Sequence, residues 1–162
     1  MPKLHITMVI QDLYRLGAQY VTALLARGLS QRGHTVEVLV SSLHERMAYE
    51  RPDLQPLELP ESVRCTVLPQ AKASRNMPAL ARYFRTRQVD LVMPMSGIYE
   101  SACVLALAFM SPRKRPRMVP VVHSGGIGMR LKKSRVMHHG SSFEVVRRFT
   151  SRRVDHVVAV SQ

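Results

Sequence analysis

The sequence has few cysteines and no long apolar stretch. Its 162 residues include two cysteines, Cys65 and Cys103, too few for a disulfide framework. Both lie in apolar runs, so we predict buried thiols in a reducing compartment. No apolar stretch reaches the roughly 18 residues of a membrane span, and residues 1–6 lack the apolar core of a signal peptide. These absences predict a cytoplasmic protein, and the length fits one domain.

Several catalytic motifs are also missing. The sequence contains neither a P-loop nor a G-x-S-x-G nucleophile turn. The loop after the first apolar segment has a single glycine, Gly17, and the second such segment ends at Val40 without an acidic residue. A nicotinamide cofactor is therefore disfavoured, because its fingerprint needs three glycines and a later acid. No His, Cys or carboxylate cluster has metal-ligand spacing, so we expect no metal.

Acidic residues are scarce. The chain has 24 Lys and Arg residues against 11 Asp and Glu residues, a net charge of +13. Residues 111–162 alone hold 12 basic residues and two acidic ones. This imbalance favours an anionic partner, either nucleic acid, an acidic membrane surface or a phosphorylated substrate. Only Phe143 and Phe149 interrupt the basic region with aromatics, so nucleic acid is the weakest of the three.

Predicted strands alternate with predicted helices along most of the chain. Apolar, β-branched runs predict strands over residues 3–10, 35–40, 63–68, 89–95, 118–123 and 155–160. Helical spacing predicts helices over residues 18–31, 78–87, 97–110 and 143–153. Residues 41–62 are predicted as a surface excursion, and residues 124–142 show no period. This alternation predicts an α/β, Rossmann-like three-layer domain with a mostly parallel sheet.

The loop over residues 11–19 follows the first predicted strand and opens the first predicted helix. Ligands of open α/β sheets bind at the carboxyl ends of strands, and helix N-termini favour anions. Gly17 and Ala18 have side chains small enough for a phosphate to reach the backbone. The alternative is that Gly17 only makes the turn. Gly33, after the helix, is predicted to be its C-cap.

His123 ends another predicted strand and precedes a glycine-rich stretch that includes Gly125 and Gly126. An imidazole at a strand's carboxyl end can bind a sugar hydroxyl or a phosphate, or act as an acid or base. The alternative is a structural histidine. The glycines would permit close approach of a ligand to the backbone.

The basic residues of the C-terminal third can be interpreted in two ways. Lys132, Lys133, Arg148 and Arg152 are predicted to contact a membrane or another anion, with Arg148 and Arg152 spaced as helical neighbours. A solvated helix face is the alternative.

Three groups of motifs occur in an order that is familiar. The first comprises L-G-A-Q at 16–19, A-R-G-L at 26–29 and R-G-H-T-V at 32–36. The second comprises V-D-L-V at 89–92 and V-P-V-V-H-S at 119–124, and the third is R-V-D-H-V-V-A-V-S at 153–161. With these motifs the chain resembles the N-terminal half of a family 4 glycosyltransferase, whose GT-B fold has two facing Rossmann-like domains.

The resemblance implies that residues 1–162 are the acceptor-side domain of a retaining glycosyltransferase. Such an enzyme moves a sugar from a nucleotide diphosphate donor to a lipid-linked or saccharide acceptor, and its nucleotide-binding C-terminal domain is absent from this chain. The chain alone would then be inactive, and the protein would be cytoplasmic or peripheral on the inner membrane face. A non-catalytic Rossmann-like module that binds polyanions or a protein partner is the alternative.

The resemblance also assigns residues. Gly17 and Ala18 would approach the donor diphosphate, and His123, the candidate catalytic residue, would contact the transferring sugar. Contacts with the acceptor are expected at Tyr14, Arg15, Ser96, Tyr99, Gly125 and Gly126. The sequence departs from the family pattern at Leu16 and Gln19, where the family has glycine and glutamate, and at Met93 and Met95, where it often has histidine.

Overall fold

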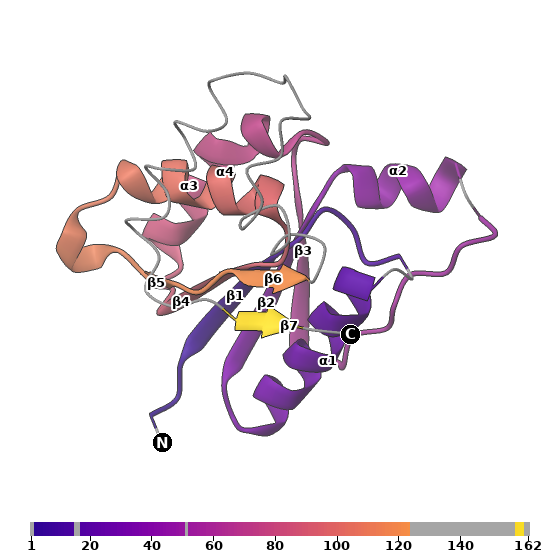
Figure 1. Cartoon of the computed structure of the whole chain (residues 1–162), viewed down its shortest axis with the longest axis horizontal. Helices are drawn as coiled ribbons and strands as arrows, with labels where there is room; N and C mark the ends of the chain where they lie inside the picture. Colours follow the sequence, from indigo (N-terminus) through magenta and orange to yellow (C-terminus); the bar gives the residue numbers. More distant parts are fainter. Residues whose placement is uncertain (1, 15–16, 51, 124–157, 161–162) are drawn as a thin grey trace, which may run out of the picture.

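A five-stranded parallel sheet forms the centre of the computed structural model (Figure 1), which describes residues 2–14, 17–50, 52–123 and 158–160. The strand order is β3-β2-β1-β4-β5, and every pairing is parallel. The strands are β1 (His5–Val9), β2 (Thr35–Ser41), β3 (Val63–Leu68), β4 (Leu91–Pro94) and β5 (Arg117–Met118). The predicted α/β, Rossmann-like class is confirmed.

A second, two-stranded sheet pairs β6 (Val121–His123) with β7 (Val158–Val160) in parallel. The prediction of one strand over residues 118–123 is wrong, because Pro120 lies between β5 and β6. Val119 still donates from its backbone nitrogen to the oxygen of Val92, 2.9 Å away. Proline has no N–H to continue this ladder. The predicted helix over residues 143–153 lies outside the described residues.

Helices cover both faces of the main sheet (Figure 1). On one face α1 (Gly17–Gln31) packs Ala26 against a cluster that includes Met8 and Val38. On the other face α3 (Met77–Thr86) and α4 (Gly97–Ala108) pack against Val9 and Leu39. Successive residues of β1 and β2 thus point to opposite faces, as the period of two in a strand requires. The result is the predicted three-layer arrangement.

Helix α1 buries a different face from the one its apolar residues suggest. The buried positions are Gln19, Thr22 and Ala26, whereas Tyr20 is 57% exposed and Leu24 is 48% exposed. Tyr20 and Leu24 thus lie outside the face of α1 that packs against the sheet. The predicted C-cap is confirmed, since Gly33 has φ +86° and donates to the oxygen of Ser30 at 2.9 Å.

Residues 41–62 contain a helix that the sequence did not indicate. Helix α2 (Leu43–Glu50) has no buried residue, so it lacks the apolar stripe that periodicity can detect. The Ser41 Oγ accepts a hydrogen bond from the Leu43 nitrogen at 3.2 Å. Arg46 and Glu50 form an ion pair one turn apart, at 2.6 Å. Local polar contacts hold this helix.

The two cysteines have different surroundings. Cys103 is buried in α4, as predicted, and burial raises the pKa of its thiol. The prediction of a buried Cys65 is wrong, because this residue is exposed on β3. Strand β3 is at the edge of the main sheet, where only one side of the strand is paired. Phe109, the residue after α4 (Gly97–Ala108), is likewise 73% exposed.

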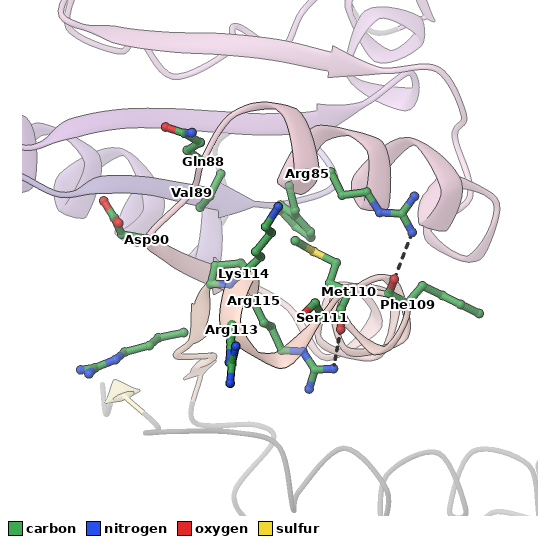
Figure 2. A pocket seen from close by; sticks show the side chains of 13 residues that line it. Arg85, Gln88, Val89, Asp90, Phe109, Met110, Ser111, Arg113, Lys114 and Arg115 are labelled. Atoms are coloured by element: carbon green, nitrogen blue, oxygen red, sulfur yellow. Dashed lines mark hydrogen bonds between the residues drawn. The ribbon is translucent and has the colours of Figure 1, made fainter.

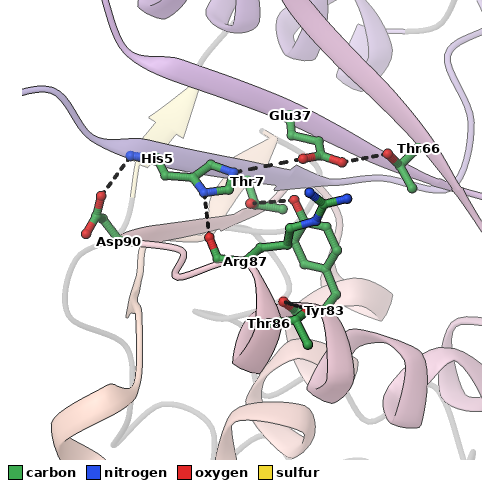
Figure 3. A network of polar contacts seen from close by, with 8 residues as sticks. All are labelled: His5, Thr7, Glu37, Thr66, Tyr83, Thr86, Arg87 and Asp90. Atoms are coloured by element: carbon green, nitrogen blue, oxygen red, sulfur yellow. Dashed lines mark hydrogen bonds and ion pairs between the residues drawn. The ribbon is translucent and has the colours of Figure 1, made fainter.

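A polar network lies within the sheet face that α3 covers (Figure 3). Glu37 of β2, only 3% exposed, accepts a hydrogen bond from the Thr66 hydroxyl of β3 at 2.6 Å. The other carboxylate oxygen of Glu37 lies 3.9 Å from the Nε2 of His5. Thr7 of β1 is 3.5 Å from the Tyr83 hydroxyl of α3, and burial raises the pKa of Tyr83. The network links three adjacent strands.

Candidate functional site

The predicted donor and acceptor residues that are described gather at the carboxyl-terminal edge of the main sheet. At the end of β2, the Ser41 nitrogen donates to the oxygen of Gln11, which follows β1, at 3.0 Å. Beyond β4, the Met95 nitrogen donates to the Val9 oxygen at 2.9 Å. The point at which the strand order changes direction lies between β1 and β4, because the chain continues from β1 to β2 on one side and from β4 to β5 on the other. Ligands of open α/β sheets bind at such a switch point.

Asp12 connects the β1–α1 loop to the first turn of α1. This residue is 6% exposed. Its Oδ1 accepts hydrogen bonds from the Tyr14 nitrogen and from the Gln19 Nε2, both at 3.1 Å. A carboxylate only accepts, so the Gln19 amide must direct its nitrogen toward Asp12. The Gln19 Oε1 is then a buried acceptor with no partner among the described residues. Sequence reasoning missed Asp12.

Tyr14 is held inside the same loop. It is 1% exposed, and its hydroxyl donates to the His44 oxygen at 3.2 Å. The centroids of the Tyr14 and His44 rings lie 5.2 Å apart. A β-bridge also joins Tyr14 to Pro56. Burial, followed by the charge of Asp12, raises the pKa of Tyr14. The predicted acceptor contact of Tyr14 stays a prediction, because its hydroxyl is engaged within the protein here.

His44, at the start of α2, holds the loop from the other side. Its Nδ1 accepts a hydrogen bond from the Leu13 nitrogen at 3.3 Å. Burial lowers the pKa of His44, and the charges of Asp12 and Glu45 oppose that shift in part. A neutral imidazole is required, since a protonated Nδ1 cannot accept. Nothing in the local sequence around His44 indicated this contact, which spans 31 residues.

Ser96 and Tyr99 begin α4 at the same edge. Ser96 occupies the N-cap position with extended backbone angles, and its side chain makes no capping hydrogen bond. Tyr99 is 1% exposed. Burial raises the pKa of Tyr99, whereas nearby Ser41 and Asn76 act to lower it. No described atom forms a hydrogen bond of acceptable geometry with the Tyr99 hydroxyl. Their predicted contacts with an acceptor are untested.

Gly17 and Ala18 are the first two residues of α1. Gly17 is exposed and Ala18 is half-buried. The first turn of α1 contains no acidic residue. The first amides of a helix have no partner within the helix and carry its positive dipole end. The amides at the start of α1 would therefore attract an anion, and the carboxylate nearest in sequence, Asp12, is already bonded to Tyr14 and Gln19.

His123 is the last residue of β6, at the carboxyl end of a parallel pair that aligns it with Val160 of β7. Its backbone position agrees with the predicted position at a strand end, and its predicted contact with a sugar stays a prediction. The remaining predicted site residues lie outside the described residues: Arg15, Gly125, Gly126, Lys132, Lys133, Arg148 and Arg152.

In the described part of the chain, no three His, Cys, Asp or Glu side chains gather closely enough to hold a metal ion. Every helix in that part of the chain is too short or too polar to cross a membrane.

Comparison with known proteins gives the family of the chain. No curated protein matches it. Among solved structures, the chain is similar to an alpha-glucosyltransferase in complex with UDP and a 13-mer DNA containing an HMU base, with a TM-score of 0.48 and 14% identity. The similarity covers 98% of this chain and 38% of that one, so this chain spans well under half of that protein's length. The model of Glycosyltransferase Family 4 matches residues 16–162, and the chain therefore belongs to Glycosyltransferase Family 4.

Proposed function

We propose that this chain is the acceptor-side domain of a retaining glycosyltransferase. The donor is a nucleotide diphosphate sugar, and the acceptor is a lipid-linked or saccharide molecule. A second Rossmann-like domain completes the GT-B fold and binds the nucleotide, so that residues 1–162 are inactive alone. Membership of the glycosyltransferase family supports the reaction class, and the residues below support the position of the site.

The observation that carries the proposal is the anchored β1–α1 loop. Asp12 and His44 fix this loop through hydrogen bonds to Tyr14, Gln19 and Leu13. Gly17 is the first residue of the helix that follows this loop, and the first amides of a helix attract anions. A diphosphate bound there would meet donors that are already oriented, which lowers the cost of organising them during transfer.

Two buried polar atoms at this edge have no described partner, namely the Gln19 Oε1 and the Tyr99 hydroxyl. Buried polar atoms are rarely left unpaired, because desolvation without a hydrogen bond costs about 1–3 kcal/mol. Sugar hydroxyls both donate and accept, so they suit both atoms. We propose that His123, at the end of β6, contacts the transferring sugar. The proposed contacts with the donor and the acceptor require no metal ion.

We further propose that the protein is cytoplasmic and associates peripherally with the inner membrane face. The basic residues Lys132, Lys133, Arg148 and Arg152 would contribute to this contact. Anionic lipids attract such residues by about 1 kcal/mol each near the surface.

The test is a glycosyl-transfer assay on the full-length protein, in which the wild type is compared with the Gly17→Trp variant. The indole would occupy the space beside the first amides of α1, and we expect at least a 100-fold loss of transfer with an unchanged circular dichroism spectrum. The matched control is Gly28→Ala on the same helix, where a Cβ would meet no atom within 4 Å. Transfer within twofold of wild type in Gly17→Trp would exclude the phosphate role.

A further inference from the structure

A polar pocket lies at the edge of the sheet opposite to Gly17, where β4 and β5 begin. It has a volume of about 710 Å³ and is formed by the turn before β4 and by the segment between α4 and β5. Five cationic side chains and one carboxylate line it: Arg85, Arg113, Lys114, Arg115, Arg117 and Asp90. This edge is remote from Gly17, which lies at the carboxyl ends of the strands. The pocket is therefore separate from the candidate transferase site.

Two of the cations are held in place by helix ends (Figure 2). The Arg85 Nη2 donates to the Phe109 oxygen at 3.1 Å, and the Arg115 Nη2 donates to the Met110 oxygen at 3.2 Å. These contacts satisfy carbonyls at the end of α4, so both arginines have a structural role. Each guanidinium has five N–H donors, and the buried Arg115 Nε has no partner among the described residues. Donors thus remain for a ligand.

The other three cations have no such role. Arg113, Lys114 and Arg117 are exposed, and no described carboxylate lies within ion-pair distance of them. In Figure 2 the Lys114 side chain extends into the space between Val89 and Arg85. The single carboxylate, Asp90, already accepts a hydrogen bond from the His5 nitrogen at 2.8 Å. The pocket therefore has an excess of positive charge, which an anion would neutralise.

An apolar groove adjoins the basic pocket. It has a volume of about 590 Å³, and Met77, Pro78 and Ala81 of α3 line it. Arg85 and Phe109 belong to both cavities. The Phe109 ring is 73% exposed. A basic pocket that continues into an apolar groove fits a ligand with an anionic head and a hydrocarbon tail.

We propose that this surface binds an anionic phospholipid, with its phosphate in the pocket that Lys114 enters, attracted also by the charges of Arg113 and Arg117, and with its apolar part against Phe109. Phosphate esters accept several hydrogen bonds at once, which matches the arginine donors. Free phosphorylated compounds share the head-group chemistry but would leave the groove unused. Nucleic acid fits less well, because Phe109 is the only aromatic side chain exposed at this surface among the described residues.

The test is co-sedimentation of the full chain with phosphatidylcholine vesicles, with and without phosphatidylglycerol, at low and high salt. The variant is Arg113→Gln combined with Lys114→Gln and Arg117→Gln. The control loses equal charge on α1, the following turn and β3, through Arg27→Gln, Arg32→Gln and Arg64→Gln, all exposed. We expect the pocket variant to bind phosphatidylglycerol vesicles at least tenfold more weakly than the control. Equal loss in both would overturn the proposal.

A second variant, Phe109→Ser, tests the groove. We expect it to weaken vesicle binding severalfold while circular dichroism stays unchanged, because the ring is exposed. Glycerol 3-phosphate and inorganic phosphate are the soluble probes, and a short oligonucleotide is the nucleic-acid probe. Competition by a soluble phosphate at low millimolar levels, without any effect of Phe109→Ser, would assign the pocket to a free phosphorylated compound. Tighter binding to the oligonucleotide than to vesicles would also overturn the lipid proposal.

Discussion

Replacing Asp12 should show how strongly the β1–α1 loop depends on one carboxylate. In Asp12→Ala the Tyr14 nitrogen and the Gln19 Nε2 lose their shared acceptor, to which both hydrogen bonds measure 3.1 Å. A hydrogen bond to a charged group contributes about 1.5–3 kcal/mol. The carboxylate is 6% exposed, so the lower cost of burying alanine offsets part of the loss. We expect a net destabilisation of about 2–4 kcal/mol.

The assay is urea unfolding followed by far-ultraviolet circular dichroism, since the chain contains no tryptophan for fluorescence. For a domain of this size each kcal/mol shifts the melting temperature by about 2–4 °C. An unchanged denaturant slope would indicate that stability has changed while the surface exposed on unfolding has not. The melting temperature should therefore fall by roughly 5–15 °C.

Asp12→Asn is the matched control. Asparagine keeps the Oδ1 acceptor in nearly the same position but removes the charge, so we expect about 1 kcal/mol of destabilisation. A loss in Asp12→Ala below about 0.5 kcal/mol would refute the reasoning. Equal losses in both variants would also refute it, because charge rather than the shared acceptor would then matter.

Two further predictions concern His44 and Gln88. Burial lowers the pKa of His44 from 6.5, so below pH 6.5 the unfolded chain binds more protons than the folded chain, and stability should fall as the pH drops from 7 toward 5. In His44→Gln the melting temperature should depend less steeply on pH. Identical pH dependences in the variant and the wild type would contradict the role of His44. Gln88 has φ +48°, a left-handed backbone conformation that costs a residue with a side chain about 1–2 kcal/mol. Gln88→Gly should therefore keep or raise the melting temperature, and Gln88→Val should lower it. A higher melting temperature for Gln88→Val than for Gln88→Gly would contradict the idea that this backbone is strained.

The central strands of the sheet could be predicted because they satisfy one strong condition. A strand buried on both faces must be apolar almost throughout, as in β2, where all positions after Thr35 are buried. The cap at Gly33 was predictable for a similarly local reason. Helix α2 was not, because none of its residues is fully buried and it leaves no periodic apolar signal. The break at Pro120 separates β5 from β6, although apolar residues continue across it.

The candidate site was only partly predictable from the sequence. Gly17 and Ala18 could be found because a loop between a strand and a helix has a fixed place in parallel sheets. The anchors of that loop could not be found, because His44 meets Leu13 across 31 residues. The exposed position of Cys65 was missed since strand order, which makes β3 an edge strand, depends on pairings between distant segments.

The buried carboxylate of Glu37 has a consequence for how β2 can align with its neighbours. A shift of β2 by one residue would turn Glu37 toward α1, where Met8 and Ala26 offer no hydrogen-bond donor from their side chains. The same shift would separate the carboxylate from Thr66, which now donates to it at 2.6 Å. An unpaired buried charge costs several kcal/mol. Glu37 thus makes a single register of the central strands far more stable than its nearest alternatives.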